Sequence, residues 1–378
     1  MKKKLVFFIS DLTYGGAQRQ LAALARAIDK EIFEVYVLYY YPDGPLEKDL
    51  QDSQVILNCI TKKGRWDLIG FYARLVSYLR KIKPDILHGY LVVPNLFTIV
   101  FKPLLPKTKI VWGIRNSNDS NARNEDWLNS PLALVEAVFS QFADLIVSNS
   151  HAGRDYCLNR GFPPQKTIVI SNGIDIDRFQ PDPEARVELR TEWQLAPETI
   201  AIGIIGRIHP LKDYPNFLQA AAILVSQHKN VAFFCFGTGE AEYEAEMYQL
   251  TQELNLTNKV RWMGTSSDIP SVCNALDLLV SASTDGEGFG NVIGEAMACG
   301  TPCVVTDVGD SAWIVDDSRL VVPRQNPQEL AEAINQFLDL KERTENLDPR
   351  SRIVQNFSIA QLAINSKAAF LELLSKQT

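Results

Sequence analysis

The chain has 378 residues, 46% of them hydrophobic and 22% charged, with a formal net charge of −7. This length exceeds what one hydrophobic core usually holds, so two globular domains are expected. No apolar run approaches the roughly 18 residues of a transmembrane helix, and six scattered cysteines without a CxxC pair, beside only four histidines, argue against a zinc site.

The charge is distributed unevenly along the chain. Residues 1–172 contain 22 Lys and Arg against 16 Asp and Glu, whereas the remaining residues contain 16 against 29. This asymmetry indicates two domains that face different partners, and an anionic membrane surface or an anionic acceptor would suit the first half. A solvated surface without any such partner explains the same numbers equally well.

The first half alternates apolar runs with amphipathic segments. After the basic start "MKKK", the first apolar run predicts a strand and not a signal peptide, because it is too short and no cleavage site follows. Helices are predicted at 16–29 and 66–83. Buried strands are predicted at 4–10, 33–41, 85–90, 109–114, 144–150 and 167–173.

The same rhythm continues after a Pro- and Asp-containing segment at 171–190, which is expected to be an irregular linker. A last helix is predicted at 357–376. Two βαβ series of this kind predict two doubly wound parallel sheets. The strands of the second series are predicted at 199–206, 231–237, 259–264, 277–283 and 301–307.

Loops that follow strands are the expected binding sites of such sheets. In "DLTYGGAQRQ", Gly15 and Gly16 let a ligand approach a helix start, although a tight turn explains them as well. In "GRIHPLKD", Arg207 and Lys212 suit a diphosphate leaving group, but two surface cations would look the same. The "FGTGE" loop is a weak dinucleotide motif and is more simply a turn.

A fourth loop leads into the segment "EGFGNVIGEAMACGTP", where a helix is expected to begin near Asn291. Its first amides, from Gly288 to Val292, would be available to phosphate oxygens. Glu287 in the loop and Glu295 in the helix could each accept two hydroxyl hydrogen bonds from a sugar or a ribose. A ligand with a diphosphate between two groups that carry hydroxyls would fit this set of residues, and a nucleotide-sugar is such a ligand. An ordinary surface helix would leave the glycines unexplained.

The run "EGFGNVIGEAMACGTPCVVTDVGD" resembles the E-x7-E signature of glycosyltransferase family 4, the retaining group 1 glycosyltransferases of GT-B fold. "GGAQRQ", "SNSHAG", "VISNGIDIDRFQP" and "GRIHPLKDY" match the family in order and span nearly the whole chain. The resemblance implies two Rossmann-like α/β domains that face a central cleft. Residues 1–172 would bind the acceptor and 173–357 the donor, while a helix at about 358–378 would pack back on the first domain.

The same resemblance implies roles for individual residues. Arg207 and Lys212 would bind the donor diphosphate, Glu287 would bind hydroxyls of the transferred sugar, and these three would form the catalytic centre. Glu295 would hold the nucleotide ribose. Further donor contacts would come from Gly15, Gly16, Gly288, Phe289, Gly290, Asn291 and Val292.

The implied reaction is retaining transfer of a hexose from a nucleotide-diphosphate sugar, with a UDP-sugar favoured, to a hydroxyl of a glycan, lipid-linked or small-molecule acceptor. Same-face attack is expected, without a cofactor and without a metal, since the expected site has the basic residues Arg207 and Lys212 where metal-dependent transferases place an Asp-x-Asp motif. A cytoplasmic protein of polysaccharide or glycolipid biosynthesis is expected, with no nucleic-acid partner. An epimerase or hydrolase of nucleotide-sugars and a non-catalytic nucleotide-sugar-binding subunit remain the alternatives.

The sequence departs from the family pattern at the segment that corresponds to the loop after the fourth strand of the family's first domain. Many relatives carry H-x-H there, whereas "ILHGYLVVPN" has His88 at the first position and Tyr90 at the second. Either side chain could serve the reaction centre, and a structural His88 is the alternative. "GGAQRQ" has Gln18 where Glu is common.

Three further features of the first half are acceptor or membrane candidates. His151 in "SNSHAG" could contact an acceptor or cap a helix. Arg115 begins the polar segment "RNSNDSNARNEDW", which also contains Asn116 and Arg123. The aromatic and basic segment 62–83, with Trp66, could lie on a membrane surface, although a helix that covers the sheet explains it better.

Overall fold

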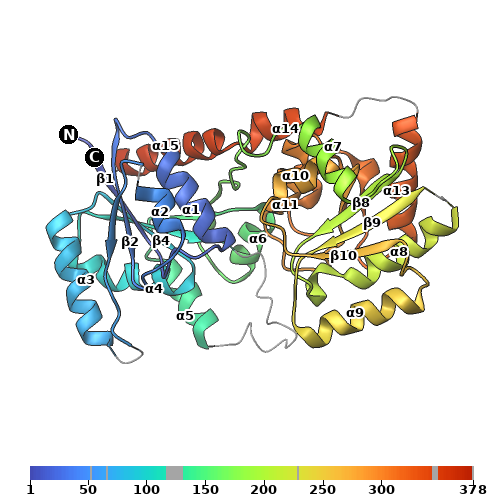
Figure 1. The fold of residues 1–378 in the computed structure, drawn as a ribbon. Coiled ribbons are helices and arrows are strands. Elements are labelled where there is room, and N and C mark those ends of the chain that lie inside the picture. The colour runs from blue at the N-terminus through green and yellow to red at the C-terminus, as the bar shows by residue number, and fades with distance from the viewer. Residues whose placement is uncertain (52, 65–66, 116–130, 228–229, 343–347, 377–378) are drawn as a thin grey trace. The chain divides into compact units, whose positions relative to one another are not determined.

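The computed structural model describes residues 1–51, 53–64, 67–115, 131–227, 230–342 and 348–376 (Figure 1). The chain divides into two compact units. Unit 1 consists of Met1–Gly173 and Ile359–Thr378, and unit 2 consists of Ile174–Ser358. Each unit is built on a parallel β-sheet, so the predicted α/β class with two parallel sheets is confirmed.

Unit 1 contains a seven-stranded sheet with the order β3-β2-β1-β4-β5-β6-β7. Its strands are β1 (Lys3–Phe8), β2 (Phe33–Tyr39), β3 (Ile56–Cys59), β4 (Ile86–Tyr90), β5 (Lys109–Ile114), β6 (Leu145–Ser148) and β7 (Thr167–Val169). Its helices are α1 (Gly16–Ala27), α2 (Leu46–Gln51), α3 (Leu68–Ile82), α4 (Val92–Phe101), α5 (Pro131–Ser140), α6 (His151–Asn159) and α15 (Ile359–Ser375).

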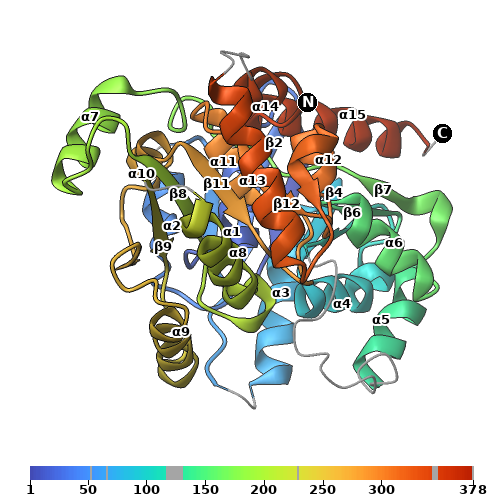
Figure 2. The ribbon, with the colours of Figure 1, turned by 90° about the vertical axis from the view of Figure 1, so that its right-hand side faces the viewer.

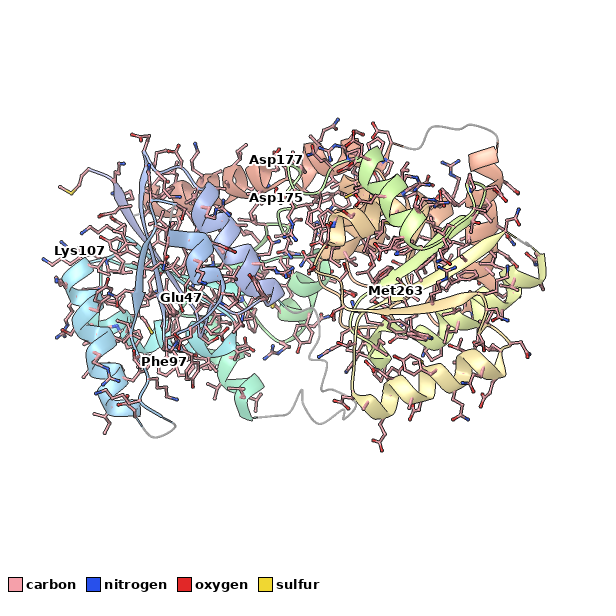
Figure 3. All side chains as sticks on the ribbon, in the orientation of Figure 1. Glu47, Phe97, Lys107, Asp175, Asp177 and Met263 are labelled. Carbon is pink, nitrogen blue, oxygen red and sulfur yellow. The ribbon has the colours of Figure 1, made fainter. Side chains whose placement is uncertain are left out.

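Two hydrophobic cores cover the opposite faces of this sheet, because successive strand residues point to opposite sides. Phe7 of β1 packs in the core formed with α1, α2 and α15. Phe8 packs in the other core, with α3 and α4. Figure 3 labels Phe97 of α4, whose ring stacks on Phe101 at 6.2 Å and meets Phe71 of α3 edge-on at 5.7 Å.

Helix α3 places its apolar stripe in the core. Phe71, Leu75 and Leu79 recur every fourth residue and are all buried. The helix therefore covers the sheet, whereas Trp66 lies outside the described residues. Within the described parts of the chain, no helix combines the length and the apolar character needed to cross a bilayer.

Unit 2 contains a six-stranded sheet with the order β10-β9-β8-β11-β12-β13. Its strands are β8 (Ile200–Ile205), β9 (Val231–Phe236), β10 (Val260–Gly264), β11 (Leu278–Ser281), β12 (Cys303–Thr306) and β13 (Val321–Val322). Its helices are α7 (Pro183–Glu192), α8 (Tyr214–Gln227), α9 (Ala241–Glu253), α10 (Ile269–Ala275), α11 (Asn291–Ala298), α12 (Ser311–Val315), α13 (Pro327–Glu342) and α14 (Pro349–Asn356).

Helices cover both faces of the second sheet. Helix α8 packs beside α9 and α13, and α11 packs beside α10, α12 and α14 (Figure 2). The strands supply a core of apolar side chains, among them Phe233, Leu279 and Val304. This arrangement is that of a doubly wound βαβ unit.

The expectation of an irregular linker over 171–190 is wrong for its second part, because α7 begins at Pro183. Asp182 caps this helix by accepting a hydrogen bond from the Ala185 amide at 2.9 Å. Proline at the first helical position after an aspartate cap is a common helix start. The helix buries no residue fully, so it lacks the apolar period by which helices are recognised in a sequence.

Candidate functional site

The candidate site of unit 2 lies where the topology of its sheet reverses. From β8 the chain builds outward to β9 and β10, and it then crosses back to β11 on the other side of β8. The loops after β8 and β11 therefore leave the same edge of the sheet as neighbours, which is the usual ligand position in such sheets. Lys212 and Arg207 lie in the first loop, and Glu287 lies in the second.

Glu287 and Lys212 form an ion pair between Oε1 and Nζ. Ser283 donates a hydrogen bond from its hydroxyl to the same carboxylate oxygen at 3.1 Å. The Thr284 amide also donates to the Leu211 carbonyl at 2.9 Å, so the backbones of the two loops are joined. Two of the three predicted catalytic residues are thus brought into direct contact.

Glycines shape the Glu287 loop and its neighbour. Gly286 has a φ of +75°, a left-handed conformation that glycine adopts without strain. Gly309, in the loop after β12, has a φ of +60°, and a Cβ there would lie 2.1 Å from the Glu287 carbonyl oxygen. The Asp310 amide donates to the Gly288 carbonyl at 3.0 Å. The loop after β12 therefore supports the backbone that carries the Glu287 carboxylate.

Helix α11 begins at Asn291, as predicted from the sequence. Its cap residue is Gly290, which has no side chain that could cover the helix start. Val292 and Glu295 are partly exposed on this helix. Phe289 is buried against the ring of Phe357 at 5.4 Å, so it anchors the loop.

Arg207 is exposed in the loop after β8. The "FGTGE" loop packs directly against this loop, because a Cβ at Gly237 would lie 1.9 Å from the Gly206 carbonyl oxygen. At Gly239 a Cβ would lie 2.0 Å from the Ile208 carbonyl oxygen. Close packing of two loop backbones explains these glycines, which favours the turn interpretation over a dinucleotide motif.

In unit 1 the topology reverses between β1 and β4; Gly15 lies in the loop after β1, and His88 lies within β4 itself. Helix α1 begins at Gly16 with Gly15 as its cap. A Cβ at Gly15 would lie 2.1 Å from the Gln18 Oε1 atom. The Gln18 amide donates to the Asp11 carboxylate at 3.1 Å, which a glutamate side chain could not do while ionised.

His88 is almost completely buried. Its ring lies 4.7 Å from the Tyr90 ring, 5.5 Å from Phe7 and 5.6 Å from Phe370 of α15. Burial, and to a smaller extent the charge of Arg115, hold the pKa of His88 well below its ordinary value, so the imidazole is neutral.

Tyr90 is fully buried, and burial raises the pKa of its hydroxyl against the opposing charge of Arg115. The Arg115 guanidinium lies 4.4 Å from the Tyr90 ring centroid, and its Nη1 donates to the Asn172 side chain at 3.1 Å. The half-buried Arg115 therefore shields Tyr90 at the end of β5. Asn116 and Arg123 lie outside the described residues.

His151 is the exposed first residue of α6. The cap of this helix is Ser150, whose hydroxyl accepts a hydrogen bond from the Gly153 amide at 3.0 Å. A capping role for His151 is therefore not needed. Among the described residues, no group of three or more His, Cys, Asp or Glu could hold a metal ion.

Sequence reasoning missed two supports of the site. Ser283 precedes Glu287 by four residues and binds its carboxylate, and Gly309 makes room for the Glu287 carbonyl. Both residues follow strands of the same sheet, so their positions directly after apolar runs were the sequence signal that could have identified them. Their contacts depend on the order of the strands.

Two family comparisons together cover most of the chain. The family described as "Glycosyltransferase Family 4" matches residues 14–178. The family described as "Glycosyl transferases group 1" matches residues 186–354. The first match falls on unit 1 and the second on unit 2, apart from a few residues at the boundary.

Similar proteins agree with these matches. A D-inositol 3-phosphate glycosyltransferase of Corynebacterium urealyticum is 30% identical over 52% of this chain and 49% of its own length. The lipopolysaccharide core biosynthesis mannosyltransferase LpsB of Rhizobium meliloti is 29% identical over 54% of this chain and 61% of its own. The chain thus spans about half the length of the first of these curated relatives and somewhat more of the second.

Solved structures share the fold over the whole chain. HepE of Anabaena, crystallised in complex with UDP, superposes with a TM-score of 0.85 at 23% identity, covering 98% of this chain and 100% of that one. At this identity the likeness concerns the fold alone. Taken together with the two family matches, it shows that the chain belongs to the group 1 glycosyltransferases of glycosyltransferase family 4 and has the GT-B fold.

Proposed function

We propose that this protein transfers a sugar from a nucleotide-diphosphate sugar, with a UDP-sugar favoured, to a hydroxyl group of an acceptor. The observation that carries the proposal is the ion pair between Glu287, in the loop after β11, and Lys212, in the loop after β8. Membership of the family supplies the reaction class. HepE, a protein of the same fold, was crystallised with UDP and with UDP-glucose, which supports UDP as the nucleotide.

The donor would bind to unit 2. Its diphosphate would take the positive charge of Lys212 and Arg207 and the amides at the start of α11, which stabilise the charge that develops on the leaving group. Lys212 would then exchange its bond to Glu287 for one to phosphate. The Glu287 carboxylate, still held by Ser283, would accept hydrogen bonds from hydroxyls of the transferred sugar.

The reaction would retain the configuration of the sugar. The bond between the anomeric carbon and the phosphate oxygen breaks while the acceptor oxygen attacks from the same face. The departing phosphate oxygen takes the acceptor proton, so neither a protein nucleophile nor a metal enters this scheme. Unit 1 would bind the acceptor, which could be a glycan, a lipid-linked sugar or a small molecule.

Glu287→Gln tests this assignment, with Glu242→Gln on the exposed side of α9 as the matched control. A panel of UDP-, GDP-, ADP- and dTDP-sugars in a thermal-shift assay first identifies the donor. We expect Glu287→Gln to keep nucleotide binding and to lose about 100-fold in transfer, the usual cost of one interaction specific to the transition state. Unchanged transfer in this variant would refute the role of Glu287.

Product analysis separates the proposal from its alternatives. A transferase consumes the donor only when an acceptor is present and gives a glycosylated product. Free sugar or an epimerised donor without an acceptor would show a hydrolase or an epimerase. Nucleotide-sugar binding without any turnover would show a binding subunit.

A further inference from the structure

Arg115 is a half-buried cation at the carboxyl end of β5 in unit 1. Its guanidinium lies on the Tyr90 ring and donates one hydrogen bond to Asn172. Its Nε atom is buried and has no hydrogen-bond partner among the described residues. No carboxylate of the described residues forms an ion pair with Arg115.

Other withdrawn arginines of this chain are compensated. Arg160 pairs with Glu136 at 2.8 Å, and Arg190 pairs with Asp277 at 3.0 Å. Arg350 donates to the carbonyl groups of three different residues. Cations withdrawn from water are normally paired in this way, because an unpaired charge is unfavourable once water is removed from it. Within the described part of the chain, Arg115 departs from this rule.

The surroundings of Arg115 hold its guanidinium in a fixed place. Tyr90 cannot move away, since its ring is packed against His88 at 4.7 Å and against Phe7 at 5.9 Å. Gly113 pairs with Tyr90 across the two strands, and a Cβ there would lie 3.4 Å from the Tyr90 ring and 3.2 Å from the His88 Nε2 atom. A fixed planar guanidinium is suited to bidentate binding of an oxyanion.

We propose that Arg115 binds an oxyanion carried by the acceptor, so that the acceptor is a hydroxylated molecule with a phosphate or carboxylate group. This inference rests on the proposed function, which assigns the acceptor to unit 1. The residue lies at the edge of the sheet where ligands of parallel sheets bind. The excess of Lys and Arg in residues 1–172, 22 against 16 acidic residues, would attract such an acceptor.

The test measures anion binding without turnover. Thermal unfolding is followed while inorganic phosphate, acetate or chloride is added at constant ionic strength, with UDP present at saturation to fill the donor site. We expect phosphate or acetate to stabilise the wild type more than chloride does, and the stronger of the two identifies the oxyanion. Arg115→Gln should bind that anion about tenfold to a hundredfold more weakly.

Arg26→Gln is the matched control, since it removes the same charge from an exposed position of unit 1. It should leave anion binding unchanged. Arg115→Lys keeps the charge without the planar fork and should bind the anion with intermediate affinity. This variant provides a second measurement in case the glutamine variant misfolds. UDP should stabilise all three variants as it does the wild type.

Two results would overturn the inference. One is equal stabilisation of the wild type and Arg115→Gln by the anion, and the other is no stabilisation of the wild type beyond chloride by either phosphate or acetate. Failure of the proposed function would look different, because no nucleotide or nucleotide-sugar would then stabilise the wild type. Anion binding at Arg115 and nucleotide binding in unit 2 are thus read separately.

Discussion

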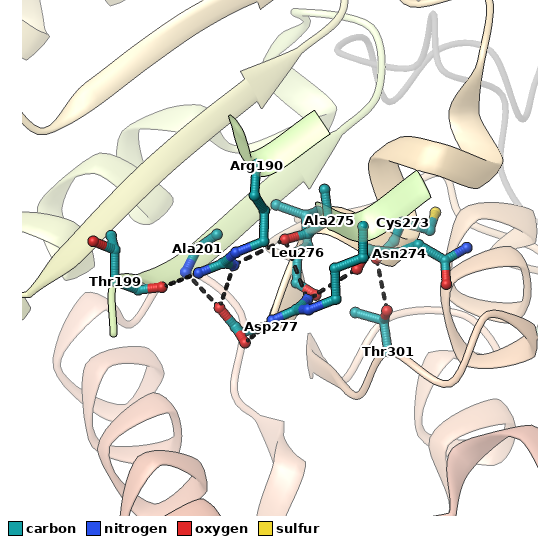
Figure 4. Close-up of polar contacts among 10 residues, drawn as sticks. Arg190, Thr199, Ala201, Cys273, Asn274, Ala275, Leu276, Asp277 and Thr301 are labelled. Carbon is teal, nitrogen blue, oxygen red and sulfur yellow. Dashed lines mark hydrogen bonds and ion pairs between the residues drawn. The ribbon is translucent and has the colours of Figure 1, made fainter. Parts of the chain in front are cut away.

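Asp277 anchors the start of β11, the strand that leads to the Glu287 loop, and Asp277→Ala should destabilise unit 2 strongly. The carboxylate accepts hydrogen bonds from Arg186 at 2.7 Å, from Arg190 at 3.0 Å and from the Ala201 amide of β8 at 2.8 Å (Figure 4). Both arginines lie on α7. One side chain therefore joins α7 to two neighbouring strands.

The magnitude follows from burial. The side chain of Asp277 is 4% exposed and that of Arg190 is 11% exposed, so their ion pair is shielded from water. Breaking a buried pair by removing one partner costs about 3–5 kcal/mol. Arg186 is 35% exposed and can be hydrated, and Arg190 keeps a bond to the Ala275 carbonyl. We therefore expect the lower end of the range, about 3 kcal/mol.

Urea unfolding followed by tryptophan fluorescence measures this loss. Trp193 is buried in unit 2, where its ring stacks on Phe234 at 4.5 Å, and it reports on the relevant core. A loss of about 3 kcal/mol lowers the thermal midpoint of a unit of this size by roughly 6–12 °C. Binding of the proposed nucleotide-sugar donor should weaken only as far as the unfolded fraction of the protein increases.

Asp317→Ala provides the control, because Asp317 pairs with Arg319, whose side chain is 46% exposed. Surface pairs contribute about 0–1 kcal/mol. A double-mutant cycle with Arg190→Ala isolates the interaction of Asp277 with Arg190. If Asp277→Ala loses less than about 1 kcal/mol, as the control should, the assignment of Asp277 as an anchor is refuted.

Two further predictions concern unit 1. The pKa of His88 is held well below its ordinary value, so below about pH 6.5 the unfolded chain binds a proton that the folded chain does not, and this group lowers stability by up to about 1.4 kcal/mol per pH unit. His88→Phe should remove this contribution, so its urea midpoint should fall less between pH 7.5 and pH 5.5 than that of the wild type. An equal fall of the two midpoints would contradict the prediction. If the basic unit 1 binds membranes, the protein should float with anionic vesicles at low salt and be released from them at high salt. No flotation at low salt would exclude that contact.

Much of the fold was predictable because its central strands are buried on both faces. Such strands form continuous apolar runs in the sequence, as at Ile200–Ile205 and Val231–Phe236. The edge strands β7 and β10 were also predicted, whereas the edge strands β3 and β13 were missed. The edge strand β3 includes an exposed Ile56 and was not predicted, and β13 has only two residues.

The site was predictable only in part. The glycines before α11 and the two glutamates lie in one continuous segment, so their spacing could be recognised in the sequence. The contacts of Arg115 with Tyr90 and Asn172 join the ends of separate chain segments, so no spacing in the sequence reveals them. For the same reason the pairing of Asp277 with two arginines of α7, about 90 residues earlier, could not be predicted.

The contact of Lys212 with Glu287 depends on how β11 is aligned along β8. In the observed register, Leu278 lies opposite Ile202, and Leu279 lies opposite Gly203. A shift by one residue would displace the Glu287 loop by about 3.3 Å, more than an ion pair tolerates, and would turn every side chain of β11 to the other face. Gly203 helps to maintain this alignment, since a Cβ there would lie 2.4 Å from the Leu276 side chain just before β11. A glycine inside a buried strand, outside both loops, thus contributes to the geometry of the proposed donor site.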